Sequence, residues 1–101
     1  MLDIKAEKSD GVMRIALEGK VNGVTARDLS QKMESELDGV HRIELDFAKL
    51  DYISSAGLRV LIAAQRHMES IGGETLCVKN ASGVVLGTLE MSGFRGVINV
   101  N

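Results

Sequence analysis

An alternation of charged and apolar residues from Arg42 to Phe47 is the feature that most restricts how this 101-residue chain can fold. Ile43, Leu45 and Phe47 occupy every second position, and charged residues lie between them. Successive side chains of a strand point to opposite faces of a sheet, so this segment predicts a strand with one dry face and one wetter face. A sheet of such strands carries helices on one face only, which argues against a doubly wound fold with continuous apolar strands.

Shorter patterns predict four more strands. Residues 2–6 and 12–17 alternate in the same way on either side of Ser9-Asp10-Gly11, which is typical of a β-hairpin. Residues 75–79 and 96–100 form short apolar runs bounded by polar residues and glycine. These two runs are interpreted as the fourth and fifth strands.

Three stretches between these strands have the period of an amphipathic helix. They cover residues 26–37, 54–71 and 82–92, and the first two end at Asp-Gly and Gly-Gly pairs. Gln65 and Glu69 fall within the apolar arc of the second helix. We therefore expect its later part to reach the edge of the core, where long side chains place their polar ends in water.

The predicted elements follow the order β-β-α-β-α-β-α-β. Such an order implies parallel strands joined by crossover helices after an antiparallel start. The expected fold class is α/β, a two-layer sandwich whose mixed, mostly parallel sheet has helices on one face. No proline, low-complexity stretch or charge block marks a boundary, so we expect a single domain over residues 1–101.

Composition argues against several classes of function. The formal net charge is −2, whereas a generic nucleic-acid binder has a strong basic excess. The longest apolar run, residues 60–64, is far shorter than the roughly 20 residues that cross a bilayer, and the N-terminus lacks the pattern of a secretory signal. We expect a cytoplasmic protein without membrane insertion. Cys77, His41 and His67 have no metal-ligand spacing, so neither a metal nor a cofactor is expected.

The segment from Leu50 to Leu61 carries the functional signal. Here a predicted strand ends at two hydroxyl residues, Ser54 and Ser55, which are followed by Ala56-Gly57 and a helix. Free N–H groups and the helix dipole attract anions to a helix N-terminus, so a phosphate esterified to a serine there would be stabilised. The alternative interpretation is that one serine caps the helix and the small pair allows close packing on the sheet.

This segment resembles the signature of STAS domains, specifically of bacterial anti-sigma factor antagonists. The resemblance rests on residues 52–61, Tyr-Ile-Ser-Ser-Ala-Gly-Leu-Arg-Val-Leu, preceded by Ile-Glu-Leu-Asp-Phe at 43–47. Residues 17–22 and the helix from Thr25 are similar to the family's early strand, loop and helix. Residues 91–94, Met-Ser-Gly-Phe, are similar to the segment that follows the third helix in this family. The resemblance thus extends through nearly the whole chain, as one STAS domain.

The resemblance implies a partner-switching protein rather than an enzyme. The unmodified form would bind an anti-sigma factor that is also a serine kinase, and so release the sigma factor. Phosphorylation would break that complex, and a PP2C-type phosphatase would restore it. The acceptor of the family's Asp-Ser-(Ser/Thr)-Gly-Leu pattern falls on Ser55, with Gly57 and Leu58 in register. Ser54 takes the usual aspartate position, and Asn22 lies where antagonists often carry an acidic residue.

A helix that begins near Ser55 places several side chains on one arc, opposite its apolar stripe. Two interpretations stay open: a solvated helix face, or an interface in which Arg59 and Arg66 meet acidic residues of a partner. The arc consists of Arg59, Ala63, Arg66, His67 and Ser70. The predicted partner-binding residues are Asn22, Ser54, Ser55, Ala56, Gly57, Arg59, Ala63 and Arg66.

Three other functions are considered. A hydrolase with Ser55 as nucleophile needs a Gly-x-Ser-x-Gly turn, but residues 53–57 lack its first glycine and no histidine is placed by sequence as a base. A nucleotide-binding loop of the Gly-x-x-x-x-Gly-Lys-Ser/Thr type is absent from the sequence. A STAS scaffold or adaptor subunit, which binds a non-sigma partner without phosphorylation, stays open.

Overall fold

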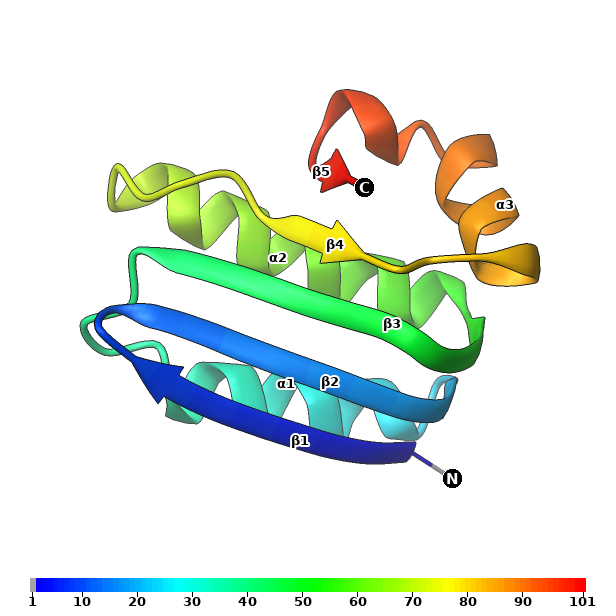
Figure 1. Cartoon of the computed structure of the whole chain (residues 1–101), viewed down its shortest axis with the longest axis horizontal. Helices are drawn as coiled ribbons and strands as arrows, with labels where there is room; N and C mark the ends of the chain where they lie inside the picture. The colour runs from blue at the N-terminus through cyan, green and yellow to red at the C-terminus, as the bar shows by residue number, and fades with distance from the viewer. Residues whose placement is uncertain (1) are drawn as a thin grey trace.

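The computed structural model describes residues 2–101 as a five-stranded mixed sheet with helices α1 and α2 on one face (Figure 1). The strands lie side by side in chain order, with β1 and β2 antiparallel and the other neighbours parallel. The predicted α/β sandwich is therefore confirmed. Its elements are β1 (Leu2–Ser9), β2 (Val12–Val21), α1 (Thr25–Ser35), β3 (Arg42–Ile53), α2 (Ser55–Ser70), β4 (Cys77–Lys79), α3 (Gly83–Met91), the 3₁₀ turn η1 (Phe94–Gly96) and β5 (Asn99–Val100).

The hairpin between β1 and β2 has the turn that its sequence predicts. Ser9 pairs with Val12, so Asp10 and Gly11 are the two turn residues. Their φ angles are 54° and 77°. Positive φ at both central residues defines a type I′ turn, whose twist matches that of the flanking strands. Asp-Gly suits it because both residue types tolerate this conformation.

The core lies between the sheet and the helices. The buried side chains of β2 and β3 are at most 6% exposed, and the alternation predicted for residues 42–47 is confirmed. Buried side chains of α1 and α2 complete the cluster. Its central members are Met13, Ile15, Leu17, Leu29, Met33, Ile43, Leu45, Phe47, Leu61 and Met68.

The last two strands are shorter than predicted, for an identifiable reason in each case. Leu76 is buried, but its N–H donates to the side chain of Gln65 at 2.8 Å, and the ladder with β3 begins only at Cys77. Gly96 belongs to η1, and the N–H of Ile98 donates to the carbonyl of Phe94 at 2.9 Å. Ladder pairing of β5 therefore starts at Asn99.

Gln65 corrects a second expectation, because it lies in the core rather than at its edge. The residue is 5% exposed, and its Oε1 accepts the hydrogen bond from the N–H of Leu76. Its Nε2 donates to Glu69 at 2.9 Å, and Glu69 is exposed. A buried amide with both ends bonded carries no unpaired polar group, which is why an otherwise apolar helix face accepts it.

Candidate functional site

The predicted site lies where β2 and β3 end. These strands are parallel and Val21 is in register with Ile53, so the turn into α1 and the turn into α2 emerge at the same edge of the sheet (Figure 1). The N–H of Ser54 donates to the carbonyl of Val21 at 2.8 Å, which ties the two turns together. Asn22 and Ser55, 33 positions apart in the chain, thereby come to the same edge.

Ser54 is the N-cap of α2. Its backbone is extended, with φ −90° and ψ 174°, and its Oγ accepts a hydrogen bond from the N–H of Gly57 at 3.3 Å. Its carbonyl accepts the first helical bond, from the N–H of Leu58 at 3.0 Å. The residue is half-buried. The capping role that the sequence left to either serine therefore belongs to Ser54.

Ser55 is the first residue of α2 and is exposed. Within residues 2–101, its hydroxyl takes part in no hydrogen bond, and neither do the backbone N–H groups of Ser55 and Ala56. An exposed hydroxyl thus stands beside two unpaired donors at the positive end of a helix. Such an arrangement favours an anionic group on the Ser55 oxygen.

Gly57 lets α2 start directly against the sheet. It is buried, and a Cβ added there would stand 2.7 Å from the Cγ1 atoms of both Val21 and Ile53. Ala56 is half-buried and packs against the core. Gly57 therefore allows close packing on the sheet, as one of the two interpretations of the small pair predicted. Because it is buried and has no side chain, it adds no side-chain contact to a binding surface.

Asn22 organises the start of α1. Its Oδ1 accepts from the N–H groups of Val24 and Thr25, each at 2.9 Å. The Thr25 hydroxyl in turn accepts from the Asn22 N–H and donates to the carbonyl of Lys20, both at 2.8 Å. These bonds need an acceptor oxygen at position 22, which Asn and an acidic residue both supply.

The residues of the predicted arc on α2 lie in two different environments. Arg59 and Arg66 are exposed, and neither has an ion-pair partner within residues 2–101. Ala63 and His67 instead border a shallow groove of about 170 Å³ between α1 and α2. Arg59 and Arg66 of the predicted arc therefore face outward, whereas Ala63 and His67 lie beside the groove with α1.

Two apolar side chains at the same edge were outside the sequence-based prediction. Val24, in the turn before α1, is 75% exposed, and Tyr52, two residues before the Ser54 cap, is 42% exposed. Partial exposure of a single valine or tyrosine has no sequence signal, because it depends on where the neighbouring turn ends. Both residues add exposed apolar area at the end of the sheet where Ser55 begins α2.

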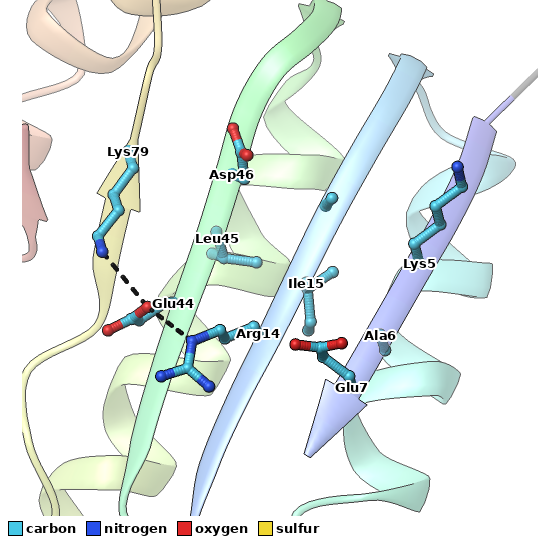
Figure 2. A pocket seen from close by; sticks show the side chains of 10 residues that line it. Lys5, Ala6, Glu7, Arg14, Ile15, Glu44, Leu45, Asp46 and Lys79 are labelled. Atoms are coloured by element: carbon cyan, nitrogen blue, oxygen red, sulfur yellow. Dashed lines mark hydrogen bonds and ion pairs between the residues drawn. The ribbon is translucent and has the colours of Figure 1, made fainter. Parts of the chain in front are cut away.

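A larger hollow lies elsewhere, on the face of the sheet that α1 and α2 leave open. It has a volume of about 420 Å³, and Figure 2 shows its lining from β1 to β4. Glu44 lies within it and accepts from Arg42 at 2.8 Å, and it forms ion pairs with Arg14 and Lys79 at 3.4 Å each. The hydrogen bond from Arg42 lowers the pKa of Glu44. None of the predicted site residues lines this hollow.

A pH dependence of stability follows from Glu44. Because its pKa in the folded protein is below the ordinary value of 4.5, the ionised carboxylate stabilises the fold above pH 4.5, and this contribution is lost as the pH falls through the folded-state pKa. We expect Glu44→Gln to lower the free energy of unfolding at pH 7 and to have little effect near pH 2. Urea unfolding at both pH values measures this, and equal effects at both would contradict it.

Among residues 2–101 there is no group of three or more His, Cys, Asp and Glu side chains that could hold a metal ion. Cys77 is buried and forms no disulfide. No helix within the described residues is long and apolar enough to cross a membrane.

Comparison with known proteins gives the family. Residues 4–99 match the family model described as Mlab, STAS domain. The chain is 35% identical over 101 residues to BtrV of Bordetella bronchiseptica, which is named as an anti-sigma factor antagonist, and the match covers 98% of this chain and 85% of BtrV.

Solved structures share the fold at lower sequence identity. An anti-sigma factor antagonist from Mycobacterium paratuberculosis has a TM-score of 0.86 at 20% identity, over 99% of this chain and 85% of that one. Unphosphorylated SpoIIAA has a TM-score of 0.79 at 17% identity, over 98% and 87%. Phosphorylated SpoIIAA from Bacillus has 0.77 at 18% identity, over 98% and 91%. This chain belongs to the STAS-domain family and, within it, to the anti-sigma factor antagonists.

Proposed function

We propose that this protein is an anti-sigma factor antagonist controlled by phosphorylation of Ser55. In its unmodified form it binds an anti-sigma factor that is also a serine kinase, and the sigma factor is released. The kinase transfers the γ-phosphoryl group of ATP to Ser55 Oγ, whose proton is lost, and ADP leaves. A PP2C-type phosphatase hydrolyses the phosphoserine and returns the protein to its binding form.

The different roles of the two serines are the observation that carries this proposal. Ser54 Oγ is half-buried and holds the N–H of Gly57, so its modification would remove the cap of α2. Ser55 is exposed and its hydroxyl has no bond to give up within residues 2–101. A kinase therefore reaches Ser55 without disturbing the fold, and a phosphatase reaches the product in the same way.

A binding surface surrounds Ser55. Val24 and Tyr52 supply apolar area, and the exposed arginines Arg59 and Arg66 follow on α2. Transient protein interfaces typically have apolar side chains near the centre of the contact area and charged or polar groups at its rim. Because the two guanidinium groups have no ion-pair partner within residues 2–101, they are available to acidic residues of the partner.

Binding, rather than catalysis, agrees with the positions of the histidines. His41 precedes β3 and Ser55 follows it, so a strand of 12 residues, about 30 Å or more, separates them. His67 is 12 residues beyond Ser55 on α2, about 18 Å along the helix axis. Neither imidazole is within hydrogen-bonding reach of Ser55 Oγ, which a general base for a serine nucleophile needs.

The test is phosphorylation by the cognate kinase with ATP, followed by mass mapping. We expect one phosphate, on Ser55, and none in Ser55→Ala. Ser54→Asp is the matched control, because aspartate also caps a helix and should leave Ser55 phosphorylation intact. Phosphate on Ser54, or phosphate that persists in Ser55→Ala, would overturn the assignment. Tight binding of the partner with no phosphate transfer would favour the scaffold alternative.

A further inference from the structure

The outer edge of β1 is unpaired. β1 is the first strand in the order of the sheet, is eight residues long, and has a strand neighbour on one side only within residues 2–101 (Figure 1). An edge of this length presents backbone donors and acceptors to another chain. The opposite edge is short: β5 has two residues, and Arg95 Nη1 donates to the carbonyl of Val100 at 3.3 Å.

β1 lacks two of the usual devices that block edge pairing, proline and a β-bulge. The chain has no proline, and the register of β1 with β2 runs through eight pairs without a bulge. Its charged residues Asp3, Lys5 and Glu7 are exposed and alternate with the half-buried Leu2, Ile4 and Ala6, which pack against the core. Asp3, Lys5 and Glu7 point to the open face of the sheet, so they would stay in water if a further strand paired with β1. Their charges therefore do not prevent pairing.

We propose that β1 pairs antiparallel with β1 of a second copy of this chain, centred on Ile4. In this register Asp3 lies opposite Lys5 of the other copy, twice by symmetry, on the open face. Ile4 lies opposite Ile4, and Leu2 opposite Ala6, on the core face. Opposite charges placed directly across a strand pair are stabilising, so the sequence of β1 is complementary to itself.

Repulsion excludes the register centred on Lys5, and Lys8 disfavours the register centred on Ala6. A pairing centred on Lys5 would place the two Lys5 side chains opposite each other and Asp3 opposite Glu7, both like-charge pairs. A pairing centred on Ala6 would place Lys5 opposite Glu7, an attractive pair, but it would also place the apolar Ile4 opposite Lys8, twice by symmetry. The Lys8 ammonium is already engaged at the end of α1, where it donates to the carbonyls of Asp38 at 2.8 Å and Glu36 at 3.4 Å.

This dimer is independent of the proposed switch. β2 separates β1 from β3, and Ser55 follows β3. Pairing through β1 therefore leaves Ser55 of both copies exposed. The dimerisation constant should be the same for the unmodified protein and for Ser55→Ala, so the two proposals can fail separately.

Sedimentation equilibrium of the 101-residue chain tests the proposal. We expect a concentration-dependent dimer that Asp3→Lys and Lys5→Asp each weaken at least about tenfold, because each change turns two attractive pairs into repulsive ones. The double variant Asp3→Lys/Lys5→Asp should restore wild-type affinity. Glu7→Lys is the matched control, since Glu7 lies outside the paired residues 2–6 and its reversal should change the dissociation constant less than about twofold.

Two results would overturn the proposal. One is a monomer at all concentrations up to about 1 mM. The other is a dimer that is weakened by Glu7→Lys but is indifferent to the charge at Asp3, which would place the contact in another register or on another surface. Circular dichroism of every variant shows whether the monomer fold is retained.

Discussion

Phosphorylation of Ser55 is expected to weaken binding of the kinase partner by at least about 100-fold while leaving the fold intact. A phosphoserine adds about −1.5 to −2 charges and a tightly hydrated group. In the proposed complex this group would lie at the end of the sheet where the turns that follow β2 and β3 also carry the exposed apolar residues Val24 and Tyr52. An interface that closes over these side chains would have to desolvate the phosphate, at a cost that only a matching basic pocket offsets.

The fold should tolerate the phosphate because the α2 cap is not the modified residue. Ser54 keeps its hydrogen bond to the N–H of Gly57, and the phosphate gains the positive end of the helix, a contribution of about 0.3–1 kcal/mol. Repulsion from the exposed Asp51, four residues before Ser55, offsets part of this gain. The melting temperature should therefore stay the same or rise by no more than about 5 °C.

Titration calorimetry without ATP, using unmodified and fully phosphorylated protein, measures the change in affinity. Ser55→Ala should bind like the unmodified protein and should lose no affinity after incubation with ATP. Equal dissociation constants for the two forms would rule out the switch. A large fall in melting temperature with loss of helical circular dichroism would show that phosphorylation acts by unfolding instead.

Gly57→Ala is expected to lower the free energy of unfolding by about 1–2 kcal/mol. The new Cβ would stand 2.7 Å from the Cγ1 atoms of Val21 and Ile53, which are 0% and 2% exposed, so buried side chains would have to shift to accommodate it. Overpacking of this kind costs about 1–3 kcal/mol, of which the higher helix propensity of alanine recovers a part.

Gly87→Ala is the matched control for this prediction. Gly87 lies inside α3, and a Cβ added there meets no atom within 4 Å. The same substitution should therefore stabilise the protein by about 0.5–1 kcal/mol. Urea unfolding of both variants measures the difference. Effects of the same sign would show that helix propensity, rather than contact with the strand ends, decides the result at Gly57.

Local patterns determined most of the fold. The alternation from Arg42 to Phe47 predicted the burial of Ile43, Leu45 and Phe47, and Asp10-Gly11 predicted the hairpin turn that the φ angles confirm. Prediction was weakest at β4 and β5, where ladder pairing starts two and three residues later than expected. A short apolar run shows that a segment is buried, but the start of a strand depends on which acceptor its N–H groups find.

The sequence by itself determined that two serines meet a helix N-terminus next to a small pair, and the family resemblance placed the acceptor on Ser55. Only the tertiary structure decided which serine caps α2 and which one is exposed. The Ser54 N–H is held by the carbonyl of Val21, and Gly57 is pressed against Val21 and Ile53. These long-range contacts hold Ser54 in an extended conformation as the cap and leave Ser55 free. Burial of Gln65 has the same origin, because its acceptor role exists only when Leu76 is packed against α2.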